Sequence, residues 1–496
     1  MKKKPSPALP LLLLLSTCAF GARAADLTLA DPFGDEMVLQ RDMKIPVWGV
    51  DDADAKVTVA FAGQTQTATA DAQGNWKVEL APLKASADNR TLSVADGKRK
   101  LEVKNVLVGE VWICSGQSNM EMGVLKVADA KKEVAAANFP AIRLRVMNHA
   151  MASLPKDAID GSPWRVCTPA SILQGSGGSF AATAYYFGRD LHRELHVPVG
   201  LVQAAWGGTL IEPWTTREGF HSQPALKAQA DWLDQAIAAG SQKWVPQNTQ
   251  PTVLYNAMVA PWIRFPVRGA IWYQGESNHI QHDGALYADR MTALVGGWRK
   301  AWDRTDADFP FYFVQIAPYN YAGFKCAPAS MGAFWEAQQK AAQTIPNTGL
   351  AHTQDISDGD LHPKNKQDVG RRLARLALSR TYGKKMQGGA SITDDCGPEF
   401  KALTVKADRL IVSFDHANSG LASRDGKPLS HFEIAGKDHL FAPAQAQIEG
   451  AAVVLKSAKV PAPVEVRFGW NDTAQPNLMN RDKLPAATFH AAAPAN

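Results

Sequence analysis

The stretch 111–120 places a serine, Ser118, between an apolar run rich in β-branched residues and a helix-compatible segment at 121–132. The intervening Ser-Gly-Gln-Ser predicts a tight turn. A serine at such a strand-to-helix junction has its hydroxyl lifted clear of the sheet, and the first N–H groups of the helix face whatever it attacks. This placement suggests acyl transfer with Ser118 as the nucleophile.

A serine hydroxyl needs a base to take its proton, and His362 is the best placed of the 12 histidines. It lies in the segment Asp-Gly-Asp-Leu-His-Pro at 358–363, between an apolar run and a helix-compatible segment. A histidine beside a carboxylate is the pattern of a general base and its orienting acid. Asp360 is the nearest acid, Asp358 is equally within reach, and a backbone carbonyl is the third candidate for orienting the imidazole.

Two further motifs offer donors to the oxyanion that forms when a serine attacks an ester. The segment Trp-Gly-Gly-Thr at 206–209 follows a strand-like run, and its paired glycines, Gly208 among them, let a backbone N–H approach a ligand closely. The segment 272–278 carries Gln274, whose side-chain amide is a suitable oxyanion donor. A polar loop that satisfies its own backbone is the other interpretation of this segment.

A parallel sheet covered by helices would bring these motifs together. Apolar runs alternate with longer helical stretches between residues 106 and 385, which predicts an α/β domain. The expected strands lie at 106–114, 199–204, 269–273, 311–316 and 349–353, and the expected helices at 181–194, 285–302, 333–344 and 365–382. Ligands bind at the carboxyl ends of the strands in such sheets, and each motif above follows a strand.

Short alternating runs separated by turn residues flank this part on both sides. They predict a β-sandwich-like domain at 25–105 and a second β domain at 386–496. The expected strands lie at 38–39, 47–48, 57–61, 76–80 and 92–94, and at 403–405, 410–414, 431–434, 452–455 and 464–468.

The first 24 residues have the composition of a secretory signal peptide: a basic start, an apolar stretch at 9–20 and Ala-Arg-Ala at 22–24. The apolar stretch is too short to span a bilayer, and no later segment has 18 uninterrupted apolar residues. We therefore expect a secreted or periplasmic protein without a membrane span. Lipid attachment at Cys18 is the less favoured alternative.

The net charge argues against two classes of partner, and the cysteine spacing argues against a zinc site. Four of the 53 basic side chains lie in the signal segment, and without them the net charge falls from +5 to +1. Nucleic acids and anionic membrane surfaces both require a strong basic excess, so neither is expected as a partner. The remaining cysteines allow three disulfide pairings, and their spacing resembles no zinc site. These cysteines are Cys114, Cys167, Cys326 and Cys396.

The motifs resemble the sialate O-acetylesterase family, a branch of the SGNH-type carbohydrate esterases. The matching segments are 116–120, 206–209, 273–278 and 361–366, and the likeness extends to 37–41 and 47–49 near the N-terminus and to 468–471, 477–478 and 484–485 near the C-terminus. The resemblance implies a multidomain protein in which a flavodoxin-like SGNH hydrolase domain with a parallel sheet, at 106–385, lies between the two β domains.

The resemblance also implies a serine esterase that removes O-acetyl groups from sugars and needs no metal or organic cofactor. Ser118 would be the nucleophile and His362 the base. Asp360 would be the acid, because Gly359 stands where the SGNH acid usually precedes its histidine by three residues. Gly208 and Gln274, with the N–H of Ser118, would form the oxyanion hole.

Four residues complete the candidate site as substrate-binding groups: Asn119, Glu276, Trp206 and Trp214. A structural anchor is the favoured role of Glu276. Trp206, Trp214 and Trp272 lie near strand ends, where they would either stack on a sugar ring or pack in the core.

The substrate and the class of function have alternatives. The same chemistry would serve acetylated xylan, xyloglucan or another plant glycan as well as sialic acid. A catalytically inert glycan-binding protein is the alternative of another class, disfavoured because Ser118 and His362 are both present. A peptidase on the same residues is disfavoured because the resemblance points to esters. The sequence does not set the oligomeric state.

Overall fold

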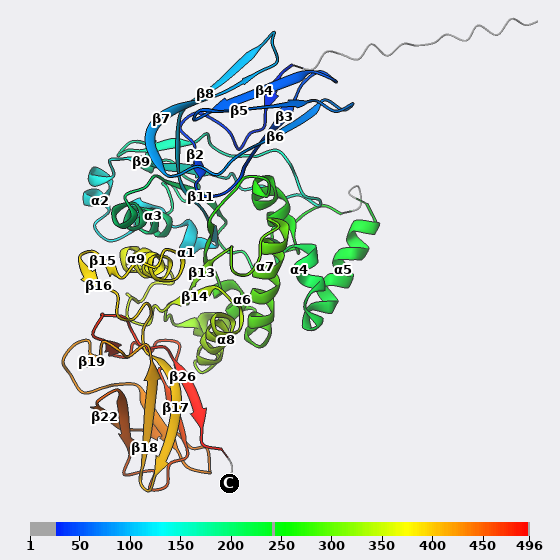
Figure 1. Ribbon diagram of the computed structural model, residues 1–496. Coiled ribbons are helices and arrows are strands. Elements are labelled where there is room, and N and C mark those ends of the chain that lie inside the picture. The colour runs from blue at the N-terminus through cyan, green and yellow to red at the C-terminus, as the bar shows by residue number, and fades with distance from the viewer. Residues whose placement is uncertain (1–25, 241–243, 495–496) are drawn as a thin grey trace, which may run out of the picture.

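The computed structural model describes residues 26–240 and 244–494, so the expected signal peptide and Cys18 lie outside the described residues. Figure 1 shows three regions in chain order: strands at the N-terminal end, a central part of strands and helices, and a second group of strands at the C-terminal end.

The central sheet contains all five strands that the sequence predicts. The strands of this sheet are β8 (Lys100–Gly116), β9 (Phe139–Val146), β10 (Arg165–Cys167), β11 (Val199–Ala205), β12 (Gly269–Tyr273), β13 (Phe311–Val314) and β14 (Thr348–Ala351). Their spatial order is β10-β9-β11-β8-β12-β13-β14, and all neighbours pair in parallel except β10 with β9. The five predicted strands therefore follow the order 2-1-3-4-5, with β9 added beyond β11.

Strand β9 was not predicted because Arg143 and Arg145 interrupt its apolar pattern. Both arginine side chains are nevertheless buried. Arg143 Nε donates to the carbonyl oxygen of Glu36 at 2.8 Å, and Arg145 Nη2 donates to Asp31 at 2.9 Å. The strand can bury these charges because groups of the N-terminal region accept hydrogen bonds from both guanidinium groups.

Helices cover both faces of the sheet. They are α1 (Ser118–Glu121), α2 (Ala130–Ala136), α3 (Ala182–Leu195), α4 (Arg217–His221), α5 (Lys227–Ala238), α6 (Glu276–Ile280), α7 (Tyr287–Ala301), α8 (Ser330–Thr344) and α9 (Lys366–Leu376). Successive side chains of β8 point to opposite faces of the sheet and pack in two hydrophobic cores. Ile113 belongs to the core that contains residues of α7 and α8, and Trp112 belongs to the core that contains residues of α3 and α9. The predicted helices at 181–194, 285–302, 333–344 and 365–382 correspond to α3, α7, α8 and α9, the last followed by a π-helical turn (Ala377–Thr381).

The predicted helix at 121–132 is wrong as a continuous element. Helix α1 ends at Glu121, a 3₁₀ turn covers Val124–Lys126, and α2 begins only at Ala130. Gly123 instead forms a β-bridge with Ala181, and a Cβ at Gly123 would lie 2.2 Å from Ser179 Oγ. The helix does not continue past Glu121 because Gly123 pairs with Ala181, in the segment that precedes α3.

Every predicted strand of the two flanking regions forms. The N-terminal strands are β1 (Thr28–Leu29), β2 (Val38–Gln40), β3 (Ile45–Val50), β4 (Lys56–Phe61), β5 (Gln64–Thr69), β6 (Asn75–Leu80) and β7 (Ser86–Ala95). The C-terminal strands are β15 (Met386–Gln387), β16 (Ala390–Ser391), β17 (Glu399–Lys406), β18 (Arg409–Asp415), β19 (Leu421–Ser423), β20 (Phe432–Ala435), β21 (Ala442–Pro443), β22 (Gln445–Glu449), β23 (Ala452–Lys456), β24 (Glu465–Phe468), β25 (Leu478–Asn480) and β26 (Phe489–Ala492). Two four-stranded antiparallel sheets, β17-β18-β23-β22 and β21-β20-β24-β26, enclose the C-terminal core.

Strand β8 belongs to two regions at once. Its first half pairs with β7 and β2, and its last residues pair with β11 and β12. The predicted boundary between residues 105 and 106 therefore falls inside one continuous strand, and the division into domains stays a prediction.

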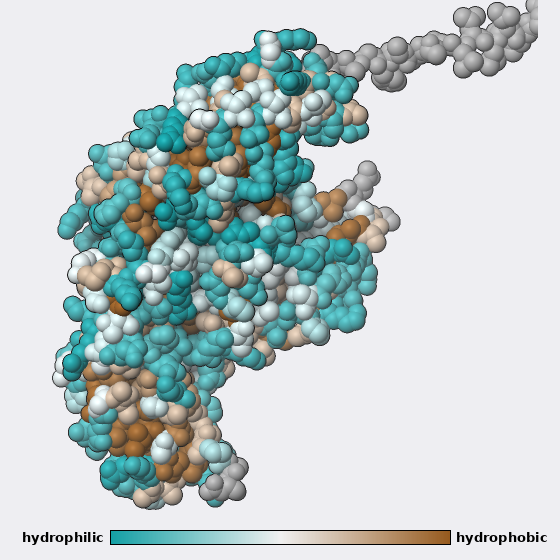
Figure 2. Space-filling view, in the orientation of Figure 1, coloured by the Kyte–Doolittle hydropathy of each residue, from teal (hydrophilic) through white to brown (hydrophobic). Residues whose placement is uncertain are grey.

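The surface and the cysteines bear on two further expectations. The face seen in Figure 2 is mostly hydrophilic over the central part and has an apolar area over the C-terminal strands. Within the described residues, no helix combines the length and the apolar character needed to cross a membrane. Cys114, Cys167, Cys326 and Cys396 are buried and free, so none of the possible disulfides forms among them.

Candidate active site

Three strand ends meet in one row at the carboxyl edge of the central sheet. Gly116 of β8 is in register with Ala205 of β11 and Tyr273 of β12. Gly116 has φ of +138°, and a Cβ there would lie 2.1 Å from the carbonyl oxygen of Tyr273, so only glycine fits this close approach. Ser118 and the two predicted oxyanion segments follow directly from this row.

Ser118 and His362, the predicted reactive pair, are hydrogen-bonded to each other. His362 Nε2 lies 2.8 Å from Ser118 Oγ, although 244 residues separate them in the chain. Both residues are half-buried and line a pocket of about 390 Å³. Its lining residues are Ser118, Glu121, Met122, Lys126, Gly177, Asp360, His362 and Lys364. This hydrogen bond is the contact that a general base needs to take the proton of a hydroxyl.

Asp360 contacts the histidine less closely than an acid of a triad would. Its Oδ1 lies 3.7 Å from His362 Nδ1, beyond hydrogen-bond distance, and its side chain is 57% exposed. The same oxygen accepts the backbone N–H of His362 at 2.9 Å. Asp358 accepts the backbone N–H groups of Asp360 and Lys364, so both carboxylates shape the loop.

The environment of His362 favours the neutral imidazole that a base requires. Burial lowers its pKa below the ordinary value, and the positive charges of Lys366 and Lys126 act in the same direction. Asp360 opposes them. The imidazole is therefore ready to accept a proton at neutral pH.

Asn119 and Glu276 lie behind the reactive pair and not in the pocket. Asn119 is fully buried, and its Nδ2 donates to Glu276 Oε1 at 2.5 Å and to the carbonyl oxygen of Leu361 at 3.1 Å. Lys366 Nζ donates to Asn119 Oδ1 at 2.6 Å. These interactions occupy the polar atoms of the Asn119 side chain, and neither Asn119 nor Glu276 lines the pocket, so the substrate-binding predictions are corrected. The hydrogen bond from Asn119 is compatible with the predicted role of Glu276 as a structural anchor.

Gln274 is also placed away from the reacting groups. Its side chain is fully buried, and Nε2 donates to the carbonyl oxygen of Thr209 at 3.2 Å and to Asn278 Oδ1 at 2.7 Å. With both amide hydrogens used, Gln274 has none to offer an oxyanion. The prediction of Gln274 as an oxyanion donor is corrected: it secures the end of the 206–209 segment.

Two of the three tryptophans that the sequence places near strand ends are buried in the core, and the third is partly exposed. Trp214 and Trp272 are fully buried and pack edge to face, so Trp214 has no surface to offer a sugar and its predicted stacking role is corrected. Trp206 is half-buried, and its ring stacks on the imidazole of His149 at 4.2 Å with an interplanar angle of 5°. Of the predicted sugar-stacking rings, only Trp206 retains exposed surface.

Glu121 is a functional candidate that sequence reasoning missed. Its Oε2 accepts the N–H of Gly207 at 2.7 Å, and its Oε1 lies 2.7 Å from His149 Nε2. Burial raises the pKa of Glu121, but the hydrogen bonds from His149 and Gly207 outweigh it and leave the pKa below its ordinary value. A Cβ on Gly207 would lie 3.2 Å from Ser118 Cβ, so this segment touches the nucleophile. The signal in the sequence was the three-residue spacing from Ser118, one helical turn.

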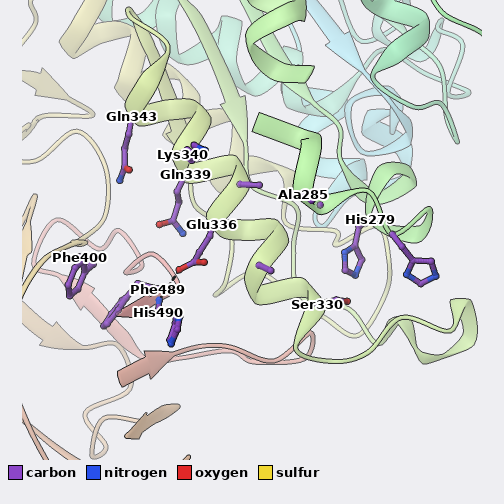
Figure 3. Close-up of a pocket in the computed structure, with 14 residues that line it drawn as sticks. His279, Ala285, Ser330, Glu336, Gln339, Lys340, Gln343, Phe400, Phe489 and His490 are labelled. Atoms are coloured by element: carbon purple, nitrogen blue, oxygen red, sulfur yellow. Dashed lines mark hydrogen bonds between the residues drawn. The ribbon is translucent and has the colours of Figure 1, made fainter. Parts of the chain in front are cut away.

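A larger cavity elsewhere does not carry comparable chemistry. A pocket of about 650 Å³ runs along α8 toward the C-terminal strands and shares no lining residue with the Ser118 pocket (Figure 3). Several of its polar groups are already used: Glu336 accepts the N–H of His490, and Gln339 donates to the carbonyl of Thr488. Its one lining serine, Ser330, donates its hydroxyl to the carbonyl oxygen of Ala327 and makes no hydrogen bond with the histidines of the lining, so volume alone does not identify the site.

One group of possible metal ligands lies outside the Ser118 pocket. Asp395, Cys396 and His416 bring three donor atoms within 4.8 Å of one another. The guanidinium of Arg380 already binds both carboxylate oxygens of Asp395, at 2.7 and 3.0 Å, and supplies the compensating charge. We assign no metal to this group.

Comparisons with known proteins identify the family of this chain. The family model described as carbohydrate esterase, sialic acid-specific acetylesterase, matches residues 108–379. The sialate O-acetylesterase of Rattus norvegicus is 30% identical over 426 residues, which cover 77% of this chain and 78% of that protein. The human sialate O-acetylesterase is 30% identical over 422 residues, covering 77% and 76%.

A solved structure matches almost the whole chain. The crystal structure of XAC1771, a novel carbohydrate acetylesterase from Xanthomonas citri, superposes with a TM-score of 0.82 at 35% identity, and the match covers 94% of this chain and 99% of that one. The resemblance inferred from the motifs is confirmed. The chain belongs to the carbohydrate esterase family of sialic acid-specific acetylesterases, and it is an esterase.

Proposed function

We propose that this protein hydrolyses O-acetyl esters of sugars through an acetyl-enzyme on Ser118. The observation that carries the proposal is the 2.8 Å contact between Ser118 Oγ and His362 Nε2 at the mouth of an open pocket. A hydroxyl paired with a neutral imidazole is the minimum arrangement for nucleophilic acyl transfer.

The reaction proceeds in two steps. Ser118 Oγ attacks the acetyl carbonyl while His362 Nε2 takes its proton, and the tetrahedral intermediate collapses as His362 protonates the departing sugar oxygen. Water, deprotonated by His362, then attacks the acetyl group on Ser118. As the bond between the acetyl carbon and Ser118 Oγ breaks, His362 returns the proton to Oγ and acetate is released.

Backbone donors stabilise the oxyanion in this proposal. Within the described residues, the N–H groups of Ser118 and Gly208 make no internal hydrogen bond, whereas the N–H of Gly207 is held by Glu121. Gly208 has φ of +75°, a conformation that glycine adopts without strain, and it lies in the segment that touches Ser118. Two such donors supply the electrostatic stabilisation that acyl transfer needs.

The central part of the chain is proposed to be an SGNH-type, flavodoxin-like hydrolase domain. The order 2-1-3-4-5 of the five predicted strands is the flavodoxin-like order, and Ser118 follows β8, where the strand order reverses. Strand β9 would be an addition to that plan. This assignment rests on topology, and the chemistry rests on the site.

An acidic sugar such as O-acetylated sialic acid is the proposed substrate. Lys126 and Lys364 line the pocket, and neither ammonium makes an ion pair within the described part of the chain. The acidic lining residues are engaged, Glu121 with His149 and Asp360 with its own loop. Two unpaired ammonium groups favour a sugar that carries a carboxylate over the neutral xylan or xyloglucan.

Hydrolysis of p-nitrophenyl acetate tests the chemistry. Ser118→Ala and His362→Ala should each lower kcat by at least about 10³-fold, because the nucleophile and its base act as a unit. His221→Ala, at an exposed position on α4, is the matched control. Full activity in Ser118→Ala protein would overturn the mechanism.

Acetate release from O-acetylated sialic acid, acetylated xylan and acetylated xyloglucan tests the substrate. The Lys126→Ala/Lys364→Ala double variant should raise KM for the sialic acid ester about 10-fold, since this ester carries a carboxylate. Hydrolysis of p-nitrophenyl acetate should be unchanged at a pH above the acid limb, where His362 is neutral with or without the charge of Lys126. Faster release from xylan or xyloglucan than from sialic acid would assign the neutral polysaccharide instead.

Export is proposed from the first 24 residues, with cleavage after Ala24. Amino-terminal sequencing of protein recovered from the periplasm or medium should begin at Ala25. A mature protein that retains Met1, or that carries lipid on Cys18, would contradict it.

A further inference from the structure

The orientation of His362 needs an explanation that Asp360 does not supply. In a Ser–His–Asp triad a buried carboxylate accepts the Nδ1–H and fixes the imidazole. Here the Asp360 carboxylate is largely exposed and lies 3.7 Å from Nδ1. His362 nevertheless presents Nε2 to Ser118 at 2.8 Å, so something else holds the ring in place.

The two peptide carbonyls that flank His362 are both tied to the interior. The carbonyl of Leu361, just before the histidine, accepts from Asn119 Nδ2 at 3.1 Å. The carbonyl of Pro363, just after it, accepts from Lys366 Nζ at 2.7 Å. Asn119 directly follows the nucleophile, and Lys366 Nζ also binds Asn119 Oδ1 at 2.6 Å. One compact network therefore joins the turn of the base to the turn of the nucleophile.

Lys366 is an unusual residue to find at the centre of such a network. Its side chain has no exposed surface, and it makes no ion pair within the described residues. Its Nζ lies 5.4 Å from the centre of the Tyr273 ring. Glu276 shares a hydrogen bond with Asn119 and acts on the ammonium through its charge, without forming an ion pair with it. Burying an ammonium is costly, and this one is placed where its hydrogen bonds hold the catalytic loop.

We propose that Lys366 is a positioning residue of this esterase: with Asn119, it fixes the peptide groups on both sides of His362 and takes over the orienting role of a triad carboxylate. The inference rests on the proposed function and adds to it the means by which the base is aligned. Alignment of this kind governs rate, since a misplacement of about 1 Å can cost 10²-fold.

The charge of Lys366 gives the proposal a second readout. The groups that act on the His362 imidazole are Lys366 on α9, Asp360 on its own loop, Lys126 in the turn after α1, and Ser118, which binds Nε2. After burial itself, Lys366 contributes most to lowering the pKa of His362, and Asp360 raises it. Removing Lys366 should therefore move the acid limb of the kcat/KM profile to higher pH, and removing Asp360 should move it to lower pH.

The experiment compares full-length Lys366→Met, Lys366→Gln, Asp360→Asn and Arg371→Met with the wild type. Arg371 lies on the same helix as Lys366, but its side chain is exposed and paired with Asp368, so it is the matched control. Measurements are kcat and KM for p-nitrophenyl acetate from pH 5 to 9, the rate at which a fluorophosphonate labels Ser118, and the melting temperature.

Lys366→Met should lower kcat and the labelling rate about 10²-fold, with KM changed less than about threefold and the acid limb shifted upward. Lys366→Gln keeps an N–H donor without the charge; it should lose less rate and show the same upward shift, and it serves as the test if the Met variant fails to fold. Arg371→Met should match the wild type.

Two outcomes separate this inference from the proposed function. Wild-type protein that neither hydrolyses the ester nor labels at Ser118 would overturn the proposed function. Active wild type, with folded Lys366 variants that keep its kcat and its pH profile, would overturn the role of Lys366 alone.

Discussion

The two sides of His362, the proposed catalytic base, are supported in different ways. On the buried side, Asn119 and Lys366 hold the flanking carbonyls through hydrogen bonds of 3.1 and 2.7 Å. On the exposed side, Asp360 contributes a charge at 3.7 Å and a turn of the loop. The difference teaches that position and charge can be supplied separately: the interior fixes where the base lies, and the solvent side adjusts its affinity for a proton.

Among substitutions of the residues that surround Ser118 and His362, removal of the Asn119 side chain should cause the largest loss of kcat. Asn119→Ala deletes the bond to Leu361 and one of the two acceptors of Lys366, so kcat should fall by about 10² to 10³-fold through misalignment of Ser118 and His362. Steady-state kinetics on p-nitrophenyl acetate measure it, with Asn75→Ala, exposed on β6, as the control. A folded Asn119→Ala protein with kcat within threefold of the wild type would show that the interior does not position the base.

Glu121 extends the comparison to the oxyanion side of the nucleophile. Glu121→Gln keeps an oxygen for the N–H of Gly207 but loses the charged acceptor shared with His149, so kcat/KM should fall about 10-fold, equivalent to roughly 1.4 kcal/mol. A boronic acid that forms a tetrahedral adduct on Ser118 should lose affinity by the same factor. Glu218→Gln, exposed on α4, is the control, and unchanged boronate affinity would contradict the prediction.

Substitution of Asp360 should lower the rate less than substitution of Asn119 or Glu121. Asp360→Asn should lower kcat by less than about fivefold, because the amide oxygen still accepts the N–H of His362 and only a screened charge is lost. The acid limb of the pH profile should move downward, since this carboxylate raises the pKa of His362. A loss above 10²-fold with no movement of that limb would restore Asp360 as the acid of a conventional triad.

The buried Lys366 should also make the free energy of unfolding depend on pH. Burial lowers the pKa of Lys366 from its ordinary 10.5 to about 7, so between these values the unfolded chain binds a proton that the folded protein does not. The free energy of unfolding of the wild type should therefore rise with pH across this window. Lys366→Met should lack that rise, so the free energy of unfolding of the variant minus that of the wild type should be most positive below pH 7 and should fall as the pH rises. Urea unfolding of both proteins at pH 6, 8 and 10 measures the difference, and parallel curves would contradict it.

Patterns along the chain predicted the reactive pair because strand ends are local features. Ser118 follows an apolar run directly, and His362 lies in a polar loop between a strand and a helix. Nothing local distinguishes a polar side chain that faces the pocket from one that faces the interior. Gln274 and Asn119 were assigned to catalysis or substrate for this reason, and only their completed hydrogen bonds place them behind the site.

Long-range pairing accounts for the other differences. Strand β9 carries two arginines, and each has one hydrogen-bond acceptor more than 100 residues away, so the local pattern does not predict a buried strand. The helix expected at 121–132 is interrupted because Gly123 meets Ala181. Lys366 was visible in the sequence, but its role depends on Asn119, a residue 247 positions earlier.

The 17 residues of β8 have a consequence for how this enzyme can be divided. The strand begins in the N-terminal antiparallel pairing and ends two residues before the nucleophile. A fragment cut at residue 106 would lose the first six residues of that strand and its pairing with most of β7, and the strand that leads to Ser118 would begin at the new chain end. The N-terminal region and the site with Ser118 thus share one strand, β8. Exchanging the N-terminal region between relatives would require matching the residues of β8 as well as the surface at which the two regions meet.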